Sequence, residues 1–434
     1  MKISLFQSIL FGAFGVSALI GLFIFATYTS HSTNNTVGNV VIWGTLPKSG
    51  MDAVLTSATK SNTAFKNISY VQKDPETLST DLATAIATGN APDLILSSQE
   101  DLLSLKKFIV PIPFSSLSVH TFQSSFVGEG NLFTIPGGAG YYGIPFLVDP
   151  LVLFSNRSIL SSDGIASPPS TWEALTGLVP QVALLTPTQQ VTRGLIALGT
   201  YDNVHDARGI LSALFLQEGV PISSYTGNDI LSANLGQANS STVPPGQAVL
   251  GFYTQFADPS KVSYTWNPSL PDSQQAFLSG DLALYLGFAS EARFLSAANP
   301  NLDFNVTPLP QPATAPVKSA YGLVYAFMIP RGAKNPAGAY QAALLLTSTP
   351  GQNVAAAATG LAPATLSALA TIPSNDPVAA VSYAEALYAN GWLSPTPGDT
   401  DRVFSSMIGS VISGGSTLNV ALISAENALN PLLR

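Results

Sequence analysis

The side chains that most often carry catalysis occur here without the spacing that catalysis requires. The three histidines, His31, His120 and His205, are far apart, and no His-Glu-x-x-His segment is present. The sequence has no Gly-x-Ser-x-Gly elbow, no phosphate-binding loop and no cysteine. Asp399 and Asp401 are close enough for a cation site, although a turn followed by a helix cap explains that segment more simply. We therefore predict no catalytic residues, no metal ion and no cofactor.

Length and charge limit the classes of protein that remain. At 434 residues the chain is too long for one core and predicts two domains or lobes. Hydrophobic residues make up 46% of the sequence and charged residues only 10%, which is not the composition of a disordered chain. The net charge of −8 makes nucleic acid a poor partner.

The first 30 residues form an apolar segment with a single charge, Lys2. Such a length is enough to cross a bilayer as a helix, and no small-x-small cleavage site follows it convincingly. We expect residues 1–30 to be an uncleaved transmembrane anchor, with a cleaved signal peptide as the alternative. Residues 31–38 then form a polar tether, and Lys2 before the helix places the rest of the chain outside the cytoplasm.

The elements that must position a site begin after the tether. Residues 39–44 and 68–71 are expected to be strands, and 49–65 is expected to be a helix. Asp74-Pro75 then predicts the start of a second helix, which ends at Gly89, before a third strand at 91–96. This alternation predicts a parallel α/β sheet, whose ligands bind at the carboxyl ends of its strands.

Residues 143–156 are too uniformly apolar for a half-exposed strand, and Pro150 interrupts them. We predict two short strands hinged at Asp149-Pro150, one in each lobe. Later strands at 282–286 and 321–329 provide further crossovers. The expected domains are 39–148 and 285–322 for the first lobe, and 149–284 and 323–434 for the second.

Six short motifs, occurring in one order, resemble those of the extracellular solute-binding proteins of family 1, the sugar-binding subunits of ABC importers. They are Trp43-Gly44 after a strand, Ala91-Pro-Asp-Leu94, Tyr142-Gly-Ile-Pro-Phe146 through Leu153-Phe-Ser-Asn-Arg157, Pro169-x-Thr-Trp-Glu173, Phe277-Leu-Ser-Gly-Asp-Leu-Ala-Leu284 and Pro308-Leu-Pro310. The resemblance covers residues 39–434. It implies a two-lobe, periplasmic-binding-protein-like α/β fold that closes on a carbohydrate and delivers it to a membrane permease.

If the ligand is a sugar, aromatic faces and short polar side chains are needed to bind it. The first candidates are aromatic residues at predicted strand ends, in the glycine-rich loop before residue 143 or beside a crossover. Two acidic residues beside the crossovers, able to accept from hydroxyls, complete the set. The predicted ligand-binding residues are Trp43, Tyr141, Tyr142, Asp149, Trp266, Glu291, Tyr321 and Trp392.

Two other functions remain open from the sequence. A membrane-anchored carbohydrate-active hydrolase would need two carboxylates facing each other across the cleft. The same receptor could instead bind a polyol, a peptide or a glycerol phosphodiester, although lysine and arginine are scarce for a phosphorylated ligand. The preferred hypothesis is a monomeric receptor outside the cytoplasm, without enzymatic activity, that passes an oligosaccharide to an ABC permease.

Overall fold

The computed structural model describes residues 37–434, except 228, 237–242 and 374. The predicted anchor at 1–30 and tether residues 31–36 lie outside the described residues. Among the residues that are described, no helix is both long enough and apolar enough to cross a membrane.

Most strands join one large sheet, which runs through both lobes in the order β2-β1-β3-β13-β6-β11-β8-β7. Three short or peripheral strands are added to it, because β12 and β14 also pair with β6 and β15 pairs with β13. The strands are β1 (Val40–Gly44), β2 (Ile68–Gln72), β3 (Leu94–Ser98), β4 (Ile112–Pro113), β5 (Gly140–Tyr141), β6 (Ile144–Asn156), β7 (Leu184–Leu185), β8 (Val191–Ile196), β9 (Ser223–Tyr225), β10 (Leu231–Ala233), β11 (Leu282–Phe288), β12 (Phe304–Thr307), β13 (Ala320–Met328), β14 (Ala362–Pro363) and β15 (Ala389–Asn390).

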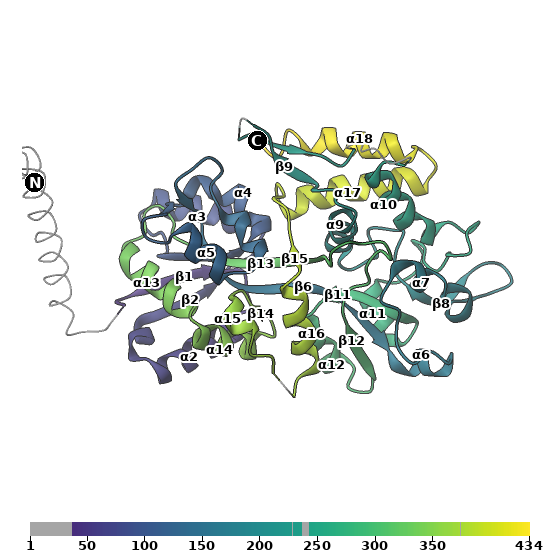
Figure 1. The fold of residues 1–434 in the computed structure, drawn as a ribbon, viewed down its shortest axis with the longest axis horizontal. Helices are drawn as coiled ribbons and strands as arrows, with labels where there is room; N and C mark the ends of the chain where they lie inside the picture. Colours follow the sequence, from purple (N-terminus) through teal and green to yellow (C-terminus); the bar gives the residue numbers. More distant parts are fainter. Residues whose placement is uncertain (1–36, 228, 237–242, 374) are drawn as a thin grey trace, which may run out of the picture.

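Helices cover the two halves of this sheet, and the chain forms two lobes joined by β6 and β13 (Figure 1). In that view the first lobe is on the left and the second on the right. The helices are α2 (Lys48–Ser61), α3 (Leu78–Ala87), α4 (Leu102–Leu105), α5 (Val119–Ser125), α6 (Arg157–Ser162), α7 (Trp172–Thr176), α8 (Val179–Val182), α9 (Ala207–Gln217), α10 (Pro245–Thr254), α11 (Ser273–Ser279), α12 (Glu291–Ala298), α13 (Pro336–Leu346), α14 (Thr349–Thr359), α15 (Leu366–Leu369), α16 (Pro377–Ala386), α17 (Pro397–Ile412) and α18 (Leu418–Leu429).

The predicted strand-helix order of the first lobe is confirmed, since β1 pairs in parallel with both β2 and β3. The second helix starts later than expected, at Leu78. The Asp74 carboxylate accepts from the amide of Glu76 at 2.9 Å. Asp74 therefore closes a turn on its own backbone, and α3 begins only after that turn.

β6 is one continuous strand of 13 buried residues, so the predicted break at Asp149-Pro150 is wrong. The predicted change of lobe at this point is nevertheless seen in the pairing. The half up to Pro150 pairs with β13 and β14, and the half from Leu151 pairs with β11 and β12. The strand tolerates Pro150 because the proline lies where one partner strand replaces another, and its carbonyl still accepts from Ala289 at 3.0 Å.

The predicted domain boundaries need two corrections. β11 and β12 both pair with the second half of β6, so residues 285–322 do not return the chain to the first lobe. In the predicted C-terminal block, 323–434, α13 packs against β1 and α14 against α2, which are first-lobe elements. The later helices, α17 and α18, pack instead with α9 and α10 of the second lobe. Hydrophobic patterns predicted that these segments are helices but could not indicate which sheet each helix covers.

Candidate functional site

A cavity of about 300 Å³ lies where the two lobes meet beside the crossing strands. Its wall includes residues that follow the carboxyl ends of β3, β8 and β11, together with the beginning of β13. Glu100 follows β3, Tyr201 follows β8, and Phe288 ends β11. Open α/β sheets bind their ligands at this edge, which makes the cavity the candidate site.

An arginine of the second lobe joins three elements beside this cavity. The Arg208 guanidinium donates to both oxygens of Glu100, each at 3.0 Å, and to both oxygens of Asp401, at 2.7 and 2.8 Å. Tyr321 donates to Glu100 at 2.7 Å, and Tyr201 donates to Asp401 at 2.6 Å. The side chain of Glu100 comes from the first lobe, so this network holds the lobes together.

The electrostatics of Arg208 follow from these contacts. Burial alone would lower the pKa of its guanidinium, but Glu100 and Asp401 outweigh burial and hold that pKa above its ordinary value. Paired hydrogen bonds from one guanidinium to two carboxylates are strong and geometrically specific. The two lobes are thus held in one defined relative arrangement.

The two predicted acidic residues, Asp149 and Glu291, have partners other than the Arg208 network. Asp149 of β6 accepts from the Ser290 amide at 3.1 Å and from the Ser290 hydroxyl at 2.6 Å. Burial raises the pKa of Asp149 to about 7. Glu291 accepts from the Phe288 amide and the Gln274 side chain, both at 2.7 Å, and from the Tyr285 hydroxyl. Both carboxyl groups are therefore used to fix the turn after β11.

Three of the predicted aromatic residues belong to the packed interior instead of the cavity. Trp266 is 1% exposed, and Trp392 is 2% exposed and donates to Ser212 at 2.9 Å. Tyr141 is stacked on Phe122, with the ring centroids 4.1 Å apart. In this arrangement no face of these rings is available to a ligand, so we correct the prediction for all three.

The other three predicted aromatic residues are better placed. Tyr321 is buried but lines the cavity. Trp43 is half-buried near the end of β1, and the Lys73 ammonium lies 3.9 Å from the centroid of its ring. Tyr142 is half-buried, and burial, with a smaller contribution from Tyr142, raises the pKa of the Tyr225 hydroxyl.

Sequence reasoning missed Glu100, Tyr201 and Arg208. The one available signal was position, since Glu100 and Tyr201 follow strands whose carboxyl ends reach the ligand edge. For Asp401 the sequence suggested a cation site or, more simply, part of a turn and cap. The turn and cap are correct for Asp399, whose amide donates to the Thr396 hydroxyl at 3.1 Å, but Asp401 lies two residues further along α17 and bonds to Arg208.

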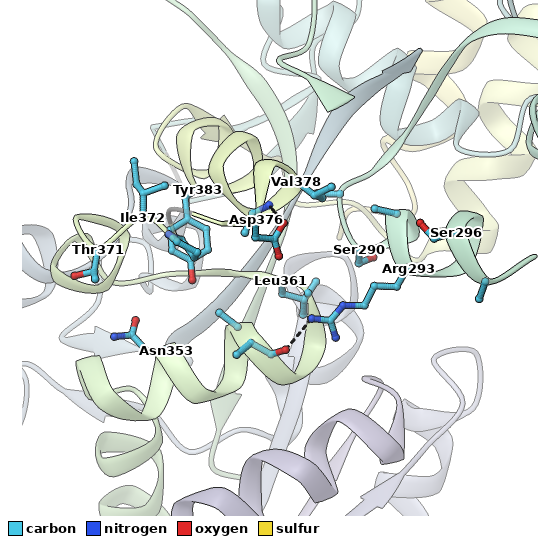
Figure 2. A pocket seen from close by; sticks show the side chains of 18 residues that line it. Ser290, Arg293, Ser296, Asn353, Leu361, Thr371, Ile372, Asp376, Val378 and Tyr383 are labelled. Carbon is cyan, nitrogen blue, oxygen red and sulfur yellow. Dashed lines mark hydrogen bonds between the residues drawn. The ribbon is translucent and has the colours of Figure 1, made fainter. Parts of the chain in front are cut away.

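A larger cavity, of about 1000 Å³, lies between α12, α14 and α16 (Figure 2). In Figure 1 these helices lie below the crossing strands, whereas α9 and α17 lie above them. Arg293 of α12 donates to the carbonyls of Ala357 and Ala358 near the end of α14, both at 2.7 Å. The walls of this larger cavity are mainly small apolar residues, and Arg293 in its lining is already paired. The larger cavity is therefore the weaker candidate for a polar ligand.

Comparison with solved structures supports the two-lobe fold. Cyclic α-maltosyl-1,6-maltose binding protein from Arthrobacter globiformis has 15% identity and a TM-score of 0.72, with 91% of this chain and 98% of that chain covered. A cyclo/maltodextrin-binding protein complexed with maltotetraose has 16% identity and a TM-score of 0.70, with 92% and 98% covered. An ABC transporter solute-binding protein from Thermotoga lettingae, bound to α-D-tagatose, has 20% identity and a TM-score of 0.67, with 91% and 100% covered.

Comparison at the level of sequence gives the family. No curated protein matches the chain. The sequence profile of bacterial extracellular solute-binding proteins matches residues 54–381, which is most of the chain and includes both lobes. The chain therefore belongs to the bacterial extracellular solute-binding protein family.

Proposed function

We propose that this solute-binding protein takes up an oligosaccharide between its lobes and presents it to the permease of an ABC importer. The observation that carries the proposal is the cavity at the carboxyl ends of β3, β8 and β11, bridged by the Glu100–Arg208 ion pair. The similar structures named above are a cyclic α-maltosyl-1,6-maltose binding protein, a protein complexed with maltotetraose and a protein bound to α-D-tagatose.

The geometry also supports a division of roles among the side chains. Carboxylate and phenol oxygens of Glu100, Tyr201 and Asp401 are suited to sugar hydroxyls when the lobes part. The half-buried rings of Trp43 and Tyr142 are suited to the apolar face of a sugar ring. Contacts to both lobes favour the closed form, and the permease recognises that form.

The setting of the receptor is part of the same proposal. Residues 1–30 anchor the chain as one transmembrane helix, and residues 31–38 tether the lobes on the outer face of the cell membrane. The protein acts as a monomer, binds no nucleic acid and performs no covalent chemistry on its solute.

A thermal-shift screen of the purified full-length protein tests the solute class. The panel contains mono- and oligosaccharides, polyols and short peptides. A solute at a hundred times its dissociation constant adds about 2.7 kcal/mol to the free energy of unfolding, which raises the midpoint visibly. An oligosaccharide that raises the midpoint and is recovered unchanged supports the proposal. A response only to peptides or polyols contradicts the sugar assignment, and consumption of the sugar indicates a hydrolase.

A further inference from the structure

Three side chains of types that can bind a metal ion come together beside the cavity, outside the Arg208 network, and two of them line it. His205, Asp206 and Glu291 each offer one ligand atom, and these atoms all lie within 4.8 Å of one another. His205 and Asp206 precede α9, while Glu291 begins α12. More than 80 residues therefore separate the two parts of the group, which is why no spacing in the sequence revealed it.

Asp206 supplies a second and independent observation. Its Oδ2 atom is buried and has no hydrogen-bond partner among the described residues. A buried carboxylate oxygen without a donor is costly, and native structures rarely leave one unexplained. The neighbouring Glu291 carboxyl group can relieve it only by sharing a proton, because the Glu291 oxygens already accept from Phe288, Gln274 and Tyr285. Either a shared proton or a bound cation would satisfy the two carboxyl groups.

The basic side chain nearest in sequence is near enough to favour the charged form of Asp206, but it does not hydrogen-bond to Asp206. Arg208 follows Asp206 by two residues, but its Nε, Nη1 and Nη2 atoms all donate to Glu100 or Asp401. Those bonds engage all three guanidinium nitrogens with carboxylates other than Asp206 and Glu291.

We propose that His205, Asp206 and Glu291 bind one divalent transition-metal ion, for which Zn²⁺ is the best-fitting probe. One imidazole and two carboxylates are a donor set typical of zinc and less suited to Ca²⁺ or Mg²⁺, which prefer oxygen ligands throughout.

The surroundings of the three residues suit this role. Asp272 Oδ2 lies 3.7 Å from His205 Nδ1, so a further carboxylate lies beside the imidazole. The donors to Glu291 fix the orientation of its carboxylate, as outer-shell hydrogen bonds do around metal ligands. Three protein ligands leave a coordination position open, and His205 and Asp206 both line the cavity. The ion would thus lie in the cavity wall, where water or an oxygen of the solute completes its coordination.

The test uses tag-free full-length protein, stripped with chelator and titrated with ZnCl₂ by calorimetry and thermal shift, without any solute. The proposal predicts one Zn²⁺ per chain, a raised midpoint, and at least tenfold weaker binding in Asp206→Asn and His205→Ala. The matched control is Asp281→Asn, which removes the same charge from an exposed site on the same lobe and should bind Zn²⁺ as the parent does. Zinc K-edge absorption of the loaded protein should show nitrogen and oxygen ligands at about 2.0–2.2 Å.

Two results would overturn the assignment. One is a Zn²⁺ response that is absent in the parent protein or is the same in Asp206→Asn. The other is a metal-free Asp206→Asn variant that is more stable than the parent while Zn²⁺ has no effect, which would mean that a shared proton bridges the carboxyl groups. Because no solute is present in these titrations, failure of the metal site and failure of the sugar proposal remain distinguishable.

Discussion

The carboxyl group of Glu129 is buried, and neither of its oxygens has a hydrogen-bond partner among the described residues. It lies close to the backbone of Gly322 on β13 and of Gly391, where the lobes are joined. Burial, with a smaller contribution from Glu100, raises the pKa of Glu129 from 4.5 to about 8. At neutral pH this side chain is therefore protonated in the folded protein.

Glu129→Gln should change how stability depends on pH. The unfolded chain loses the Glu129 proton near pH 4.5 and the folded chain near pH 8, so between these values the folded state holds one more proton. The contribution of Glu129 to stability is thus complete below pH 4.5 and falls as pH rises toward 8. We expect the variant to match the parent near pH 4.5 and to be more stable by a few kcal/mol at pH 8. Urea unfolding at both pH values measures this.

The exposed Glu76→Gln change serves as the control, since its carboxyl group is not buried in the folded protein. A difference between Glu129→Gln and the parent that is equal at the two pH values would contradict the assignment.

Alanine variants of Trp266 and Trp43 should distinguish a role in core packing from a role in solute binding. Trp266 is buried beside Gly194 of β8, so Trp266→Ala should cost about 3–5 kcal/mol of folding free energy and leave the solute affinity of the folded protein unchanged. Trp43→Ala should cost less stability and weaken solute binding, because its half-buried ring lies at the ligand edge. Chemical denaturation and calorimetric titration of both variants check this. A loss of solute affinity in a stably folded Trp266→Ala variant would mean that Trp266 contacts the solute.

At the scale of elements, α12 and α14 are the informative pair, because they belong to different lobes and one side chain joins them. Arg293 of α12 donates to two carbonyls near the C-terminus of α14, where helices leave carbonyls without partners. A cation at this end of a helix is also favoured by the helix dipole. The contact therefore links the lobes on the side of the crossing strands away from α9.

Arg293→Ala should weaken this link without disturbing either lobe. The side chain is exposed, so we expect a loss of about 1 kcal/mol in stability or less. Arg293→Lys should not restore the contact, because one ammonium cannot repeat the two-pronged geometry. Thermal unfolding and small-angle scattering of both variants test this, and full rescue by lysine would mean that charge alone matters.

At the scale of the whole molecule, the arrangement of the lobes depends on the Arg208 network above the crossing strands. A buried ion pair that loses one partner leaves an uncompensated charge, which is strongly destabilising. Here the uncompensated groups would be Glu100 and Asp401, facing each other across the lobes. The cost can be relieved by separation of the lobes, since each carboxylate then regains water.

Arg208→Gln should therefore open the molecule. We expect a larger radius of gyration without solute and at least tenfold weaker solute binding, measured by small-angle scattering and calorimetry. Arg157→Gln is the matched control, because its pair with Asp303 at 3.4 Å is exposed and lies within the second lobe. An unchanged radius of gyration in a folded Arg208→Gln variant would show that the crossing strands β6 and β13 alone set the arrangement of the lobes.

The sequence by itself determined the local elements and the family resemblance. The alternation of apolar runs and caps predicted the parallel strands of the first lobe, and the uniformly apolar stretch around Asp149 predicted the crossing strand, because burial on both faces requires such a composition. Six ordered motifs pointed to extracellular solute-binding proteins, which the match over residues 54–381 confirms.

Only the tertiary structure decided the site. Residue type predicts that a tryptophan ring will be largely buried, but not whether it packs in a core, like Trp266, or borders a cleft, like Trp43. Folding brings together segments that no local pattern connects. One result is the network of Glu100, Arg208 and Asp401, and another is the cluster of His205, Asp206 and Glu291. The chemistry of the cavity is therefore a property of the lobe interface, and no single segment of the sequence contains it.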